Sequence, residues 1–331
     1  MKSRLGALLL ASVLLLAGTA CKEEKQSDIT VYMPDGAPAL ALSKLLYEDT
    51  ESDGVRYFVV PPSKIVTAVS YTDMGKNADI CALPVTAAAK KLGSGKHYRM
   101  LGTLTRGNLY ILGREDTGIT AENISALVGK RVGVVQLSEV PGLTLKAILS
   151  KLGVPWQEIR EGVAVSDNKV NLYALAGADA IDKSGPLDCW VAGEPAVSMH
   201  ISKGLYRVGD LQALYGGGYT QAVLVAKTSV IEERSAWLQN FLADVQAGAE
   251  WVLKTDASTL VSTVTAHLED ENGSTTLKAP LLTHEALSHC GIEFRSASVC
   301  KTETQTFLQT LLAVNANATA LPADAFYHGA E

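Results

Sequence analysis

The sequence predicts an α/β protein of two lobes, with mixed, mainly parallel sheets, two hinge crossings and a ligand cleft between the lobes. Strand-like and helix-like segments alternate over residues 29–105 and again over 131–195, as in parallel sheets covered by helices. The first block has few such units, so the long helical tail after about residue 225 is expected to pack back on it. Glycines lie at both implied crossings, Gly107 and 216–218, where backbone freedom suits a hinge.

The amino-terminal segment predicts export. Two basic residues precede the apolar run 5–17, which is shorter than the roughly 20 residues that span a bilayer. Small residues precede Cys21 and a polar stretch follows it, as at a bacterial lipidation site. Gly18 departs from that pattern, so ordinary signal cleavage after residue 20 remains the alternative. We expect a signal peptide over 1–21 with lipidation of Cys21, a tether over 22–28, and a protein anchored to the outer face of the cell membrane.

The elements of the first lobe follow from short apolar runs separated by turn residues. Residues 29–33 and 55–60 are rich in β-branched and aromatic residues, which favours strands. Ser63 and Thr86 precede helix-like runs and are candidate N-caps. The other expected elements are helices 39–47, 64–74 and 86–92, and strands 79–85, 100–105 and 109–112.

The second lobe repeats the alternation, and a strand over 219–226 then returns the chain to the first lobe. Apolar residues at helical spacing predict a long helix within 235–254, and Phe307, Leu308, Leu311 and Leu312 form the clearest later stripe. The lobes are therefore expected to comprise 29–105 with 222–331, and 106–221. The expected elements between them are helices 121–128, 143–152, 168–177 and 195–202, and strands 131–135, 162–165 and 187–191.

Several stretches, in this order, resemble the solute-binding proteins of ABC transporters, in the group that binds nitrate, sulfonates, taurine and thiamine-pyrimidine precursors. They are "PDGAPALALSKLL", "ADICALPVTAAAKKL", "GTLTRGNLYIL", "GKRVGVVQ", "ALAGADAIDKSGPLDCWVAGEP" and "VLVAKTSVIEERSAWLQNFLADVQAGAEWV". The resemblance implies the type II periplasmic binding protein fold. It also implies capture of a small molecule between the lobes, delivery to a membrane permease, no cofactor and a monomeric chain.

Ligands of open α/β sheets bind at the carboxyl ends of parallel strands. The small residues of 35–37 would expose backbone N–H groups to an acceptor group of the ligand, with a plain turn as the alternative. Arg106 is either an anion partner or a solvated hinge residue, and an aromatic residue at the return crossing would stack on a planar ligand. The candidate ligand residues are Asp35, Gly36, Ala37, Pro62, Ser63, Pro84, Thr86, Arg106, Asn108, Gln136, Ser138, Asp167, Glu194, Tyr215 and Tyr219.

The charges of these loops predict a neutral or cationic planar organic ligand, such as a pyrimidine, rather than a small inorganic anion. Only Arg106 is basic, whereas Asp35, Asp167 and Glu194 are acidic. The net charge of −6 argues against nucleic acid as a partner. No GxSxG or GxxxxGK[ST] motif is present. The alternatives are an enzyme of the same fold, such as a menaquinone-pathway lyase, and a ligand-sensing subunit of a membrane receptor.

Four cysteines follow Cys21. Cys81 and Cys189 lie in strand-like runs and are expected to be buried thiols. Cys290 and Cys300 are close together in an exported chain, so we expect a local disulfide, with two free thiols as the alternative. The histidines form no metal-ligand spacing, and no metal site is expected.

Overall fold

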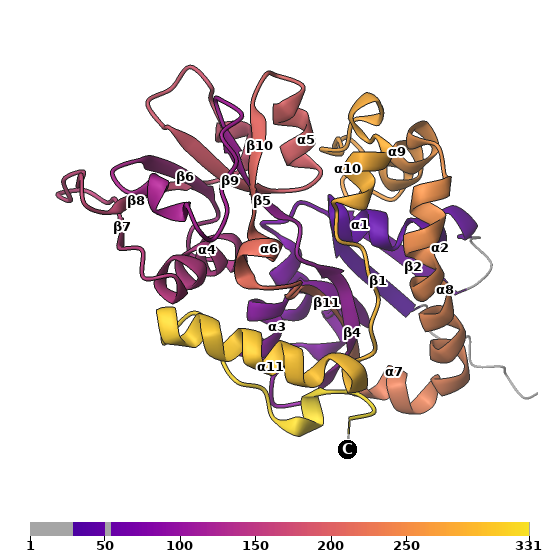
Figure 1. The fold of residues 1–331 in the computed structure, drawn as a ribbon. Helices are drawn as coiled ribbons and strands as arrows, with labels where there is room; N and C mark the ends of the chain where they lie inside the picture. The colour runs from indigo at the N-terminus through magenta and orange to yellow at the C-terminus, as the bar shows by residue number, and fades with distance from the viewer. Residues whose placement is uncertain (1–28, 50–53, 331) are drawn as a thin grey trace, which may run out of the picture.

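The computed structural model describes residues 29–49 and 54–330. The predicted signal peptide over 1–21, the lipidation site Cys21 and the tether over 22–28 lie outside the described residues. Two sheets, of five and six strands, form two lobes side by side (Figure 1), which confirms the predicted fold class. Within the described ranges, no helix is both long and apolar enough to cross a bilayer.

The five-stranded sheet has the order β2-β1-β3-β11-β4. Strands β1, β2 and β3 are parallel, so their carboxyl ends meet at one edge of the sheet, and β11 lies antiparallel between β3 and β4. This sheet thus combines the first strands of the chain with the strand that returns after the second lobe. Its strands are β1 (Ile29–Pro34), β2 (Val55–Val60), β3 (Ile80–Pro84), β4 (Tyr98–Arg106) and β11 (Thr220–Lys227).

The six-stranded sheet has the order β10-β5-β9-β6-β8-β7. Strands β9, β6, β8 and β7 are parallel to one another, whereas β5 is antiparallel to both β9 and β10. All of its strands come from the middle of the chain. They are β5 (Leu109–Gly113), β6 (Arg131–Val135), β7 (Trp156–Glu158), β8 (Val170–Leu175), β9 (Cys189–Gly193) and β10 (Tyr206–Asp210).

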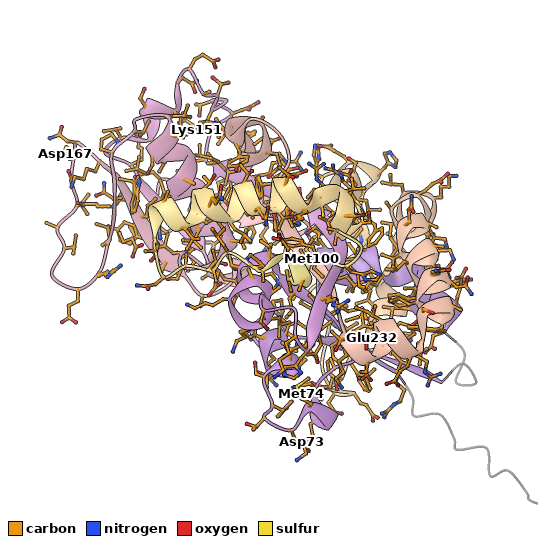
Figure 2. All side chains as sticks on the ribbon, turned by 90° about the horizontal axis from the view of Figure 1, so that it is seen from below. Asp73, Met74, Met100, Lys151, Asp167 and Glu232 are labelled. Atoms are coloured by element: carbon orange, nitrogen blue, oxygen red, sulfur yellow. The ribbon has the colours of Figure 1, made fainter. Side chains whose placement is uncertain are left out.

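Helices cover both sheets, and the last of them lies along both lobes (Figures 1 and 2). One hydrophobic cluster runs from the five-stranded sheet through this helix into the six-stranded sheet. The two lobes are therefore packed on a common core as well as joined by the chain. The helices are α1 (Ala37–Ala41), α2 (Ser43–Glu48), α3 (Val85–Leu92), α4 (Val140–Lys151), α5 (Ala196–Ile201), α6 (Leu211–Tyr215), α7 (Thr228–Glu233), α8 (Ser235–Lys254), α9 (Ala257–Ala266), α10 (His284–Ser288) and α11 (Ala297–Val314).

The first crossing between the sheets is short and tightly packed. The chain leaves β4 at Arg106 and enters β5 at Leu109. The backbone N–H of Arg106 donates to the carbonyl of Gly291 at 2.8 Å. A Cβ atom on Gly291 would lie 2.0 Å from the carbonyl oxygen of Gly107, so only glycine allows the segment before α11 to lie against this crossing.

Two elements predicted for the second lobe are wrong. The segment expected as helix 168–177 is strand β8, in which the fully buried Asn171 pairs with β6 and β7. The segment expected as strand 162–165 is an irregular loop with exposed valines. A buried asparagine within an apolar run obscured the strand, because asparagine is usually depleted in strands. Strand β10 and helix α6 occupy a region for which no element was predicted.

Some predicted helices are shorter than expected. The run expected as helix 64–74 is a 3₁₀ helix, Ile65–Val69, whose N-cap is Lys64 and not Ser63. The run expected as 121–128 is likewise a 3₁₀ helix, Ile124–Leu127. β-Branched residues in the first run and flanking turn residues disfavour a longer α-helix. The helix expected over 39–47 is divided into α1 and α2 at Leu42.

The expected disulfide between Cys290 and Cys300 is wrong. Both residues are buried free thiols, and they belong to different hydrophobic clusters. Cys290 Sγ donates to the carbonyl of Ala286, and Cys300 Sγ to that of Arg295. Sequence proximity alone did not bring their side chains together. Cys81 and Cys189 are buried free thiols, as predicted, and burial raises the pKa of Cys189 to about 12.

Candidate ligand-binding site

A cavity of about 480 Å³ lies between the two lobes. Its walls come from the carboxyl ends of β1, β2 and β3 in one lobe and from the β6–α4 turn in the other. Its size is in the range of small-molecule sites. The lining residues are Pro34, Asp35, Pro38, Pro62, Ser63, Val66, Pro84, Thr86, Ala87, Lys90, Lys91, Thr105, Asn108, Gln136, Glu139, Val140, Pro141, Gln221, Ala222 and Ala318.

The structure brings together one part of the predicted residues and separates the rest. Most of those at the ends of the parallel strands do line the cavity. The predicted residues in its lining are Asp35, Pro62, Ser63, Pro84, Thr86, Asn108 and Gln136. Those outside its lining are Gly36, Ala37, Arg106, Ser138, Asp167, Glu194, Tyr215 and Tyr219.

The amino terminus of α3 forms one wall. Thr86 is 1% exposed, lies in the first turn, and its hydroxyl has no hydrogen-bond partner among the described residues. No side chain caps α3, and the first N–H groups of a helix have no acceptor within the helix itself, so this end of α3 directs backbone donors toward the cavity. Lys90 and Lys91, one turn further along α3, also line the wall. This wall therefore offers hydrogen-bond donors and positive charge to a ligand.

The segment that follows α11 forms hydrogen bonds with this wall. The hydroxyl of Thr319 donates to the carbonyl of Thr86 at 3.0 Å, and Lys90 Nζ donates to the carbonyl of Asn317 at 2.8 Å. Between them, Ala318 contributes to the cavity lining. The segment that follows α11 is thus part of the site, which the sequence did not indicate.

The floor of the cavity is a pair of side-chain amides at the two crossings. The Oδ1 atom of Asn108 accepts a hydrogen bond from Gln221 Nε2, and the backbone N–H of Asn108 donates to Gln221 Oε1 at 3.1 Å. Asn108 lies between β4 and β5, and Gln221 lies near the start of β11. The two crossings are therefore joined by hydrogen bonds at the cavity lining.

The turn between β6 and α4 forms the wall of the second lobe. Gln136 has φ = 55°, the one positive φ of a non-glycine residue in the described ranges, and its side chain is exposed in the cavity. A Cβ atom on Gly142 would lie 2.0 Å from the carbonyl oxygen of Leu137, so the turn closes only with glycine there. Glu139 follows in the same turn. Partial burial raises the pKa of Glu139, and the charge of Lys90 opposes that shift.

Asp35 lines the cavity, but its carboxylate is already saturated. It accepts hydrogen bonds from the N–H groups of Gly36 and Thr276 and from the hydroxyls of Thr275 and Thr276, at 2.6–2.9 Å. The N–H of Asp35 donates to the carbonyl of Val60. The expectation that the N–H groups of residues 35–37 face the ligand is therefore wrong for Asp35 and Gly36, whose N–H groups are paired within the protein.

Three predicted residues of the crossings face α11 and not the cavity. Phe307 stacks on Tyr219, with ring centroids 4.8 Å apart, and meets Tyr215 edge-on at 5.6 Å. Arg106 pairs with Glu293 at 2.9 Å and with Glu303 at 2.6 Å. These side chains join the crossings to the C-terminal helix, because that helix covers the side of the crossings away from the cavity.

Of the three acidic residues that suggested a neutral or cationic ligand, Asp167 and Glu194 lie outside the cavity lining. Asp167 precedes β8 and so lies at the amino end of that strand, in a loop at the edge of the molecule (Figure 2). Glu194 accepts hydrogen bonds from the N–H and hydroxyl of Ser198 and pairs with Arg207 at 2.6 Å. Ser138 is exposed in the β6–α4 turn, outside the lining. Of the acidic residues in the lining, only Glu139 has a carboxylate without hydrogen bonds to other described residues.

Four residues of the cavity lining were not predicted from the sequence: Lys90, Lys91, Glu139 and Gln221. For most of them the sequence contained a pattern that could have indicated their position. Lys90 lies four residues after Thr86, which places both on one face of the expected helix. Glu139 lies in the turn that supplied Gln136. Gln221 faces the cavity because of the alternation along β11, whose first residues were predicted as a strand but not assigned to a face.

Comparison with solved structures shows the fold of ABC-transporter solute-binding proteins. An ABC transporter protein from Parabacteroides distasonis is 19% identical, with a TM-score of 0.69, over 92% of this chain and 100% of that one. The periplasmic aliphatic sulphonate-binding protein SsuA from Escherichia coli is 16% identical, with a TM-score of 0.62, over 88% of each chain. The desulfurization enzyme DSZB has the same fold, at 15% identity and a TM-score of 0.54, over 92% of this chain and 96% of that one.

Comparison of sequences gives less information about related proteins than comparison of structures does. No family model matches the chain. A non-reducing polyketide synthase of Pseudevernia furfuracea is 32% identical over 112 residues, which are 33% of this chain and 5% of that protein. This chain therefore spans a small part of the length of that relative.

Proposed function

We propose that this protein is the extracytoplasmic solute-binding component of an ABC importer. It captures a small organic molecule between lobe I (29–105 with 222–331) and lobe II (106–221) and delivers it to a membrane permease. The observation that carries the proposal is the cavity between the lobes, which is lined from both of them and contains the buried, unpartnered hydroxyl of Thr86. A buried polar group without a partner is costly, and a bound ligand supplies the missing partner.

The lining favours a ligand with an acidic or acceptor group on a mainly apolar body. Lys90, Lys91 and the first turn of α3 provide the donors, and prolines and valines provide much of the remaining surface. Because Asp167 and Glu194 lie outside the lining and Asp35 is saturated, the acidic residues no longer support the predicted preference for a neutral or cationic ligand. The acceptor group would lie against α3, and the opposite end would lie against Gln136 and Glu139.

Binding without turnover fits the chemistry of this cavity. Its hydroxyls come from Ser63, Thr86 and Thr105, and the described residues of its lining include no histidine or cysteine, the side chains that commonly activate a hydroxyl or act as a nucleophile. The enzyme among the structural neighbours makes catalysis the alternative to test. Mass spectrometry of compounds released from the purified, denatured protein would identify the ligand, and incubation of that ligand with fresh protein would reveal any conversion.

Replacing Thr86 by valine is expected to weaken binding of the recovered ligand about tenfold, because one hydrogen bond to it is lost. The same change is expected to leave the stability of the ligand-free protein equal or higher, since an unpaired buried hydroxyl becomes a methyl group of similar size. Isothermal titration calorimetry and urea unfolding measure the two effects.

The matched control is Thr144→Val. Thr144 is also fully buried with an unpartnered hydroxyl, but it lies in α4 outside the cavity lining. This variant is expected to bind the ligand like the wild type. Equal affinity of both variants for the ligand would show that Thr86 does not contact it.

The proposed location depends on Cys21. With lipid attached to Cys21, the protein is expected in the membrane fraction, since acyl chains partition into the bilayer. Replacing Cys21 by alanine should move it to the soluble extracytoplasmic fraction, as measured by fractionation and immunoblotting. If the variant remains with the membrane, lipidation of Cys21 is not the anchor.

A further inference from the structure

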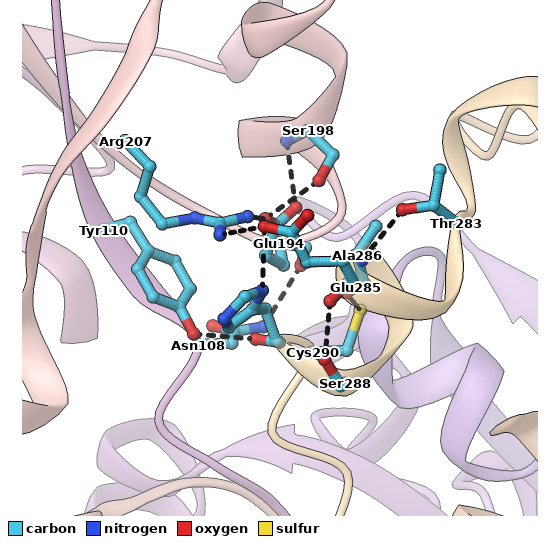
Figure 3. A network of polar contacts seen from close by, with 11 residues as sticks. Asn108, Tyr110, Glu194, Ser198, Arg207, Thr283, Glu285, Ala286, Ser288 and Cys290 are labelled. Carbon is cyan, nitrogen blue, oxygen red and sulfur yellow. Dashed lines mark hydrogen bonds and ion pairs between the residues drawn. The ribbon is translucent and has the colours of Figure 1, made fainter. Parts of the chain in front are cut away.

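Besides α11, which packs on both lobes, a second group of contacts joins the lobes at helix α10. Arg207 of β10 pairs with Glu194 of lobe II at 2.6 Å and with Glu285 of α10, in lobe I, at 2.9 Å. The hydroxyl of Tyr110 donates to the carbonyl of His289 at 3.2 Å, also across the lobes. Figure 3 shows Arg207 above the ring of Tyr110, with Glu194 and Glu285 nearby. We call Tyr110, Arg207 and Glu285 the interlobe latch.

The lobe II half of the latch is rigid. The side chain of Glu194 is fully buried. The N–H and the hydroxyl of Ser198 each donate a hydrogen bond to one of its carboxylate oxygens. The guanidinium carbon of Arg207 lies 4.9 Å from the centroid of the Tyr110 ring, a cation–π distance. A register shift between Arg207 and Gly209 in the pairing of β10 with β5 sets the direction of the arginine, as β-bulges do. One guanidinium nitrogen therefore faces lobe I with its geometry already fixed.

The lobe I half is exposed and separable. Glu285 is 72% exposed, and its helix α10 has only five residues. An exposed ion pair contributes little, so this arm of the latch can break at small cost. Breaking it leaves the buried pair of Arg207 and Glu194 intact within lobe II. If the lobes separate, the ion pair between Arg207 and Glu285 breaks, whereas the ion pair between Arg207 and Glu194 remains.

The latch is connected to the floor of the cavity. The side-chain N–H of Asn108 donates to the carbonyl of Glu194 at 3.1 Å, and Asn108 is paired with Gln221 between the two crossings. The latch is therefore linked, through Glu194 and Asn108, to the pair of amides that joins the two crossings.

We propose that the interlobe latch favours the arrangement of the lobes seen in Figure 1, which we call closed, before ligand binds. The ligand then adds to a bias that is already present, since only a difference between open and closed states shifts their populations.

The test uses ligand-free protein, so it stands whatever the ligand is. Spin labels on Lys76→Cys and Lys169→Cys, both exposed and in different lobes, report the interlobe distance by double electron–electron resonance. The Cys21→Ala background leaves only buried native thiols among the described residues. Glu285→Gln and Tyr110→Phe are each expected to raise the ratio of open to closed protein about fivefold, the effect of losing one partly exposed polar contact.

The control is Glu250→Gln. Glu250 is 74% exposed and pairs with Lys254 within α8, so its loss changes charge without affecting the contact between lobes. It is expected to keep the wild-type distance distribution. If Glu285→Gln and Tyr110→Phe also keep that distribution, the latch does not favour the closed arrangement and the proposal is overturned.

Discussion

Replacing Asp35 by alanine is expected to lower the free energy of unfolding by about 4 kcal/mol, because several buried donors lose their acceptor at once. The carboxylate is the common acceptor for Gly36, Thr275 and Thr276, which joins the end of β1 to a loop some 240 residues later in the chain. The side chain is 8% exposed, so water cannot replace all of these bonds. Urea unfolding followed by circular dichroism measures the loss.

Asp270→Ala is the control, because Asp270 is exposed and its side chain accepts the N–H of Asn272. It is expected to cost less than about 1 kcal/mol. Asp35→Asn, which keeps one acceptor oxygen, should fall between the two. If Asp35→Ala destabilises no more than Asp270→Ala, the carboxylate is not a structural clamp, and a direct role toward the ligand becomes the better interpretation.

Replacing Phe307 by alanine is expected to lower the free energy of unfolding by about 4 kcal/mol, the usual cost of deleting a buried aromatic ring. Phe307 is 1% exposed and stacks on Tyr219 beside the return crossing. In the same helix, Thr304 shares a hydrogen bond of 2.8 Å with Thr220. The variant should therefore also widen the distribution of interlobe distances, because α11 loses its aromatic contacts with Tyr215 and Tyr219 beside the return crossing.

Val299→Ala provides the comparison within the same helix, since Val299 is 63% exposed. It should change stability by less than about 0.5 kcal/mol. Thermal unfolding of the three proteins, followed by the interlobe distance measurement, checks both expectations. An unchanged distance distribution in Phe307→Ala would mean that α11 stabilises the fold without restricting the lobes.

The two-lobed fold could be predicted from the sequence because its strands are short, apolar and separated by turn residues. Strands such as β1 and β6 are short and mainly apolar, and each is followed by an α-helix, α1 and α4 respectively. Strand β8 was missed because Asn171, which is fully buried, satisfies its amide through backbone groups such as the carbonyl of Lys130. These hydrogen bonds are tertiary contacts, so the strand propensity of the local sequence does not predict them.

The candidate site was predicted in part, for a similar reason. The rule that ligands meet the carboxyl ends of parallel strands located Thr86, Gln136 and Ser63. The same rule failed for Asp167, because it was applied to a strand that does not exist. Tyr219 was misplaced because α11, far away in the sequence, covers the other side of the crossing. The side of a crossing that faces the cavity is determined by the element that covers its other side. The sequence does not show directly which element that is.

The most direct test of the account is the interlobe distance with and without the ligand recovered from the protein. The labelled pair at Lys76→Cys and Lys169→Cys is measured in the Glu285→Gln background, which is expected to start with more open molecules than the wild type. Adding the ligand is expected to shift the distribution to the shorter distance, and mass spectrometry should then recover the ligand chemically unchanged. An unshifted distribution, or a converted ligand, would contradict a protein that captures its solute by closing two lobes around it.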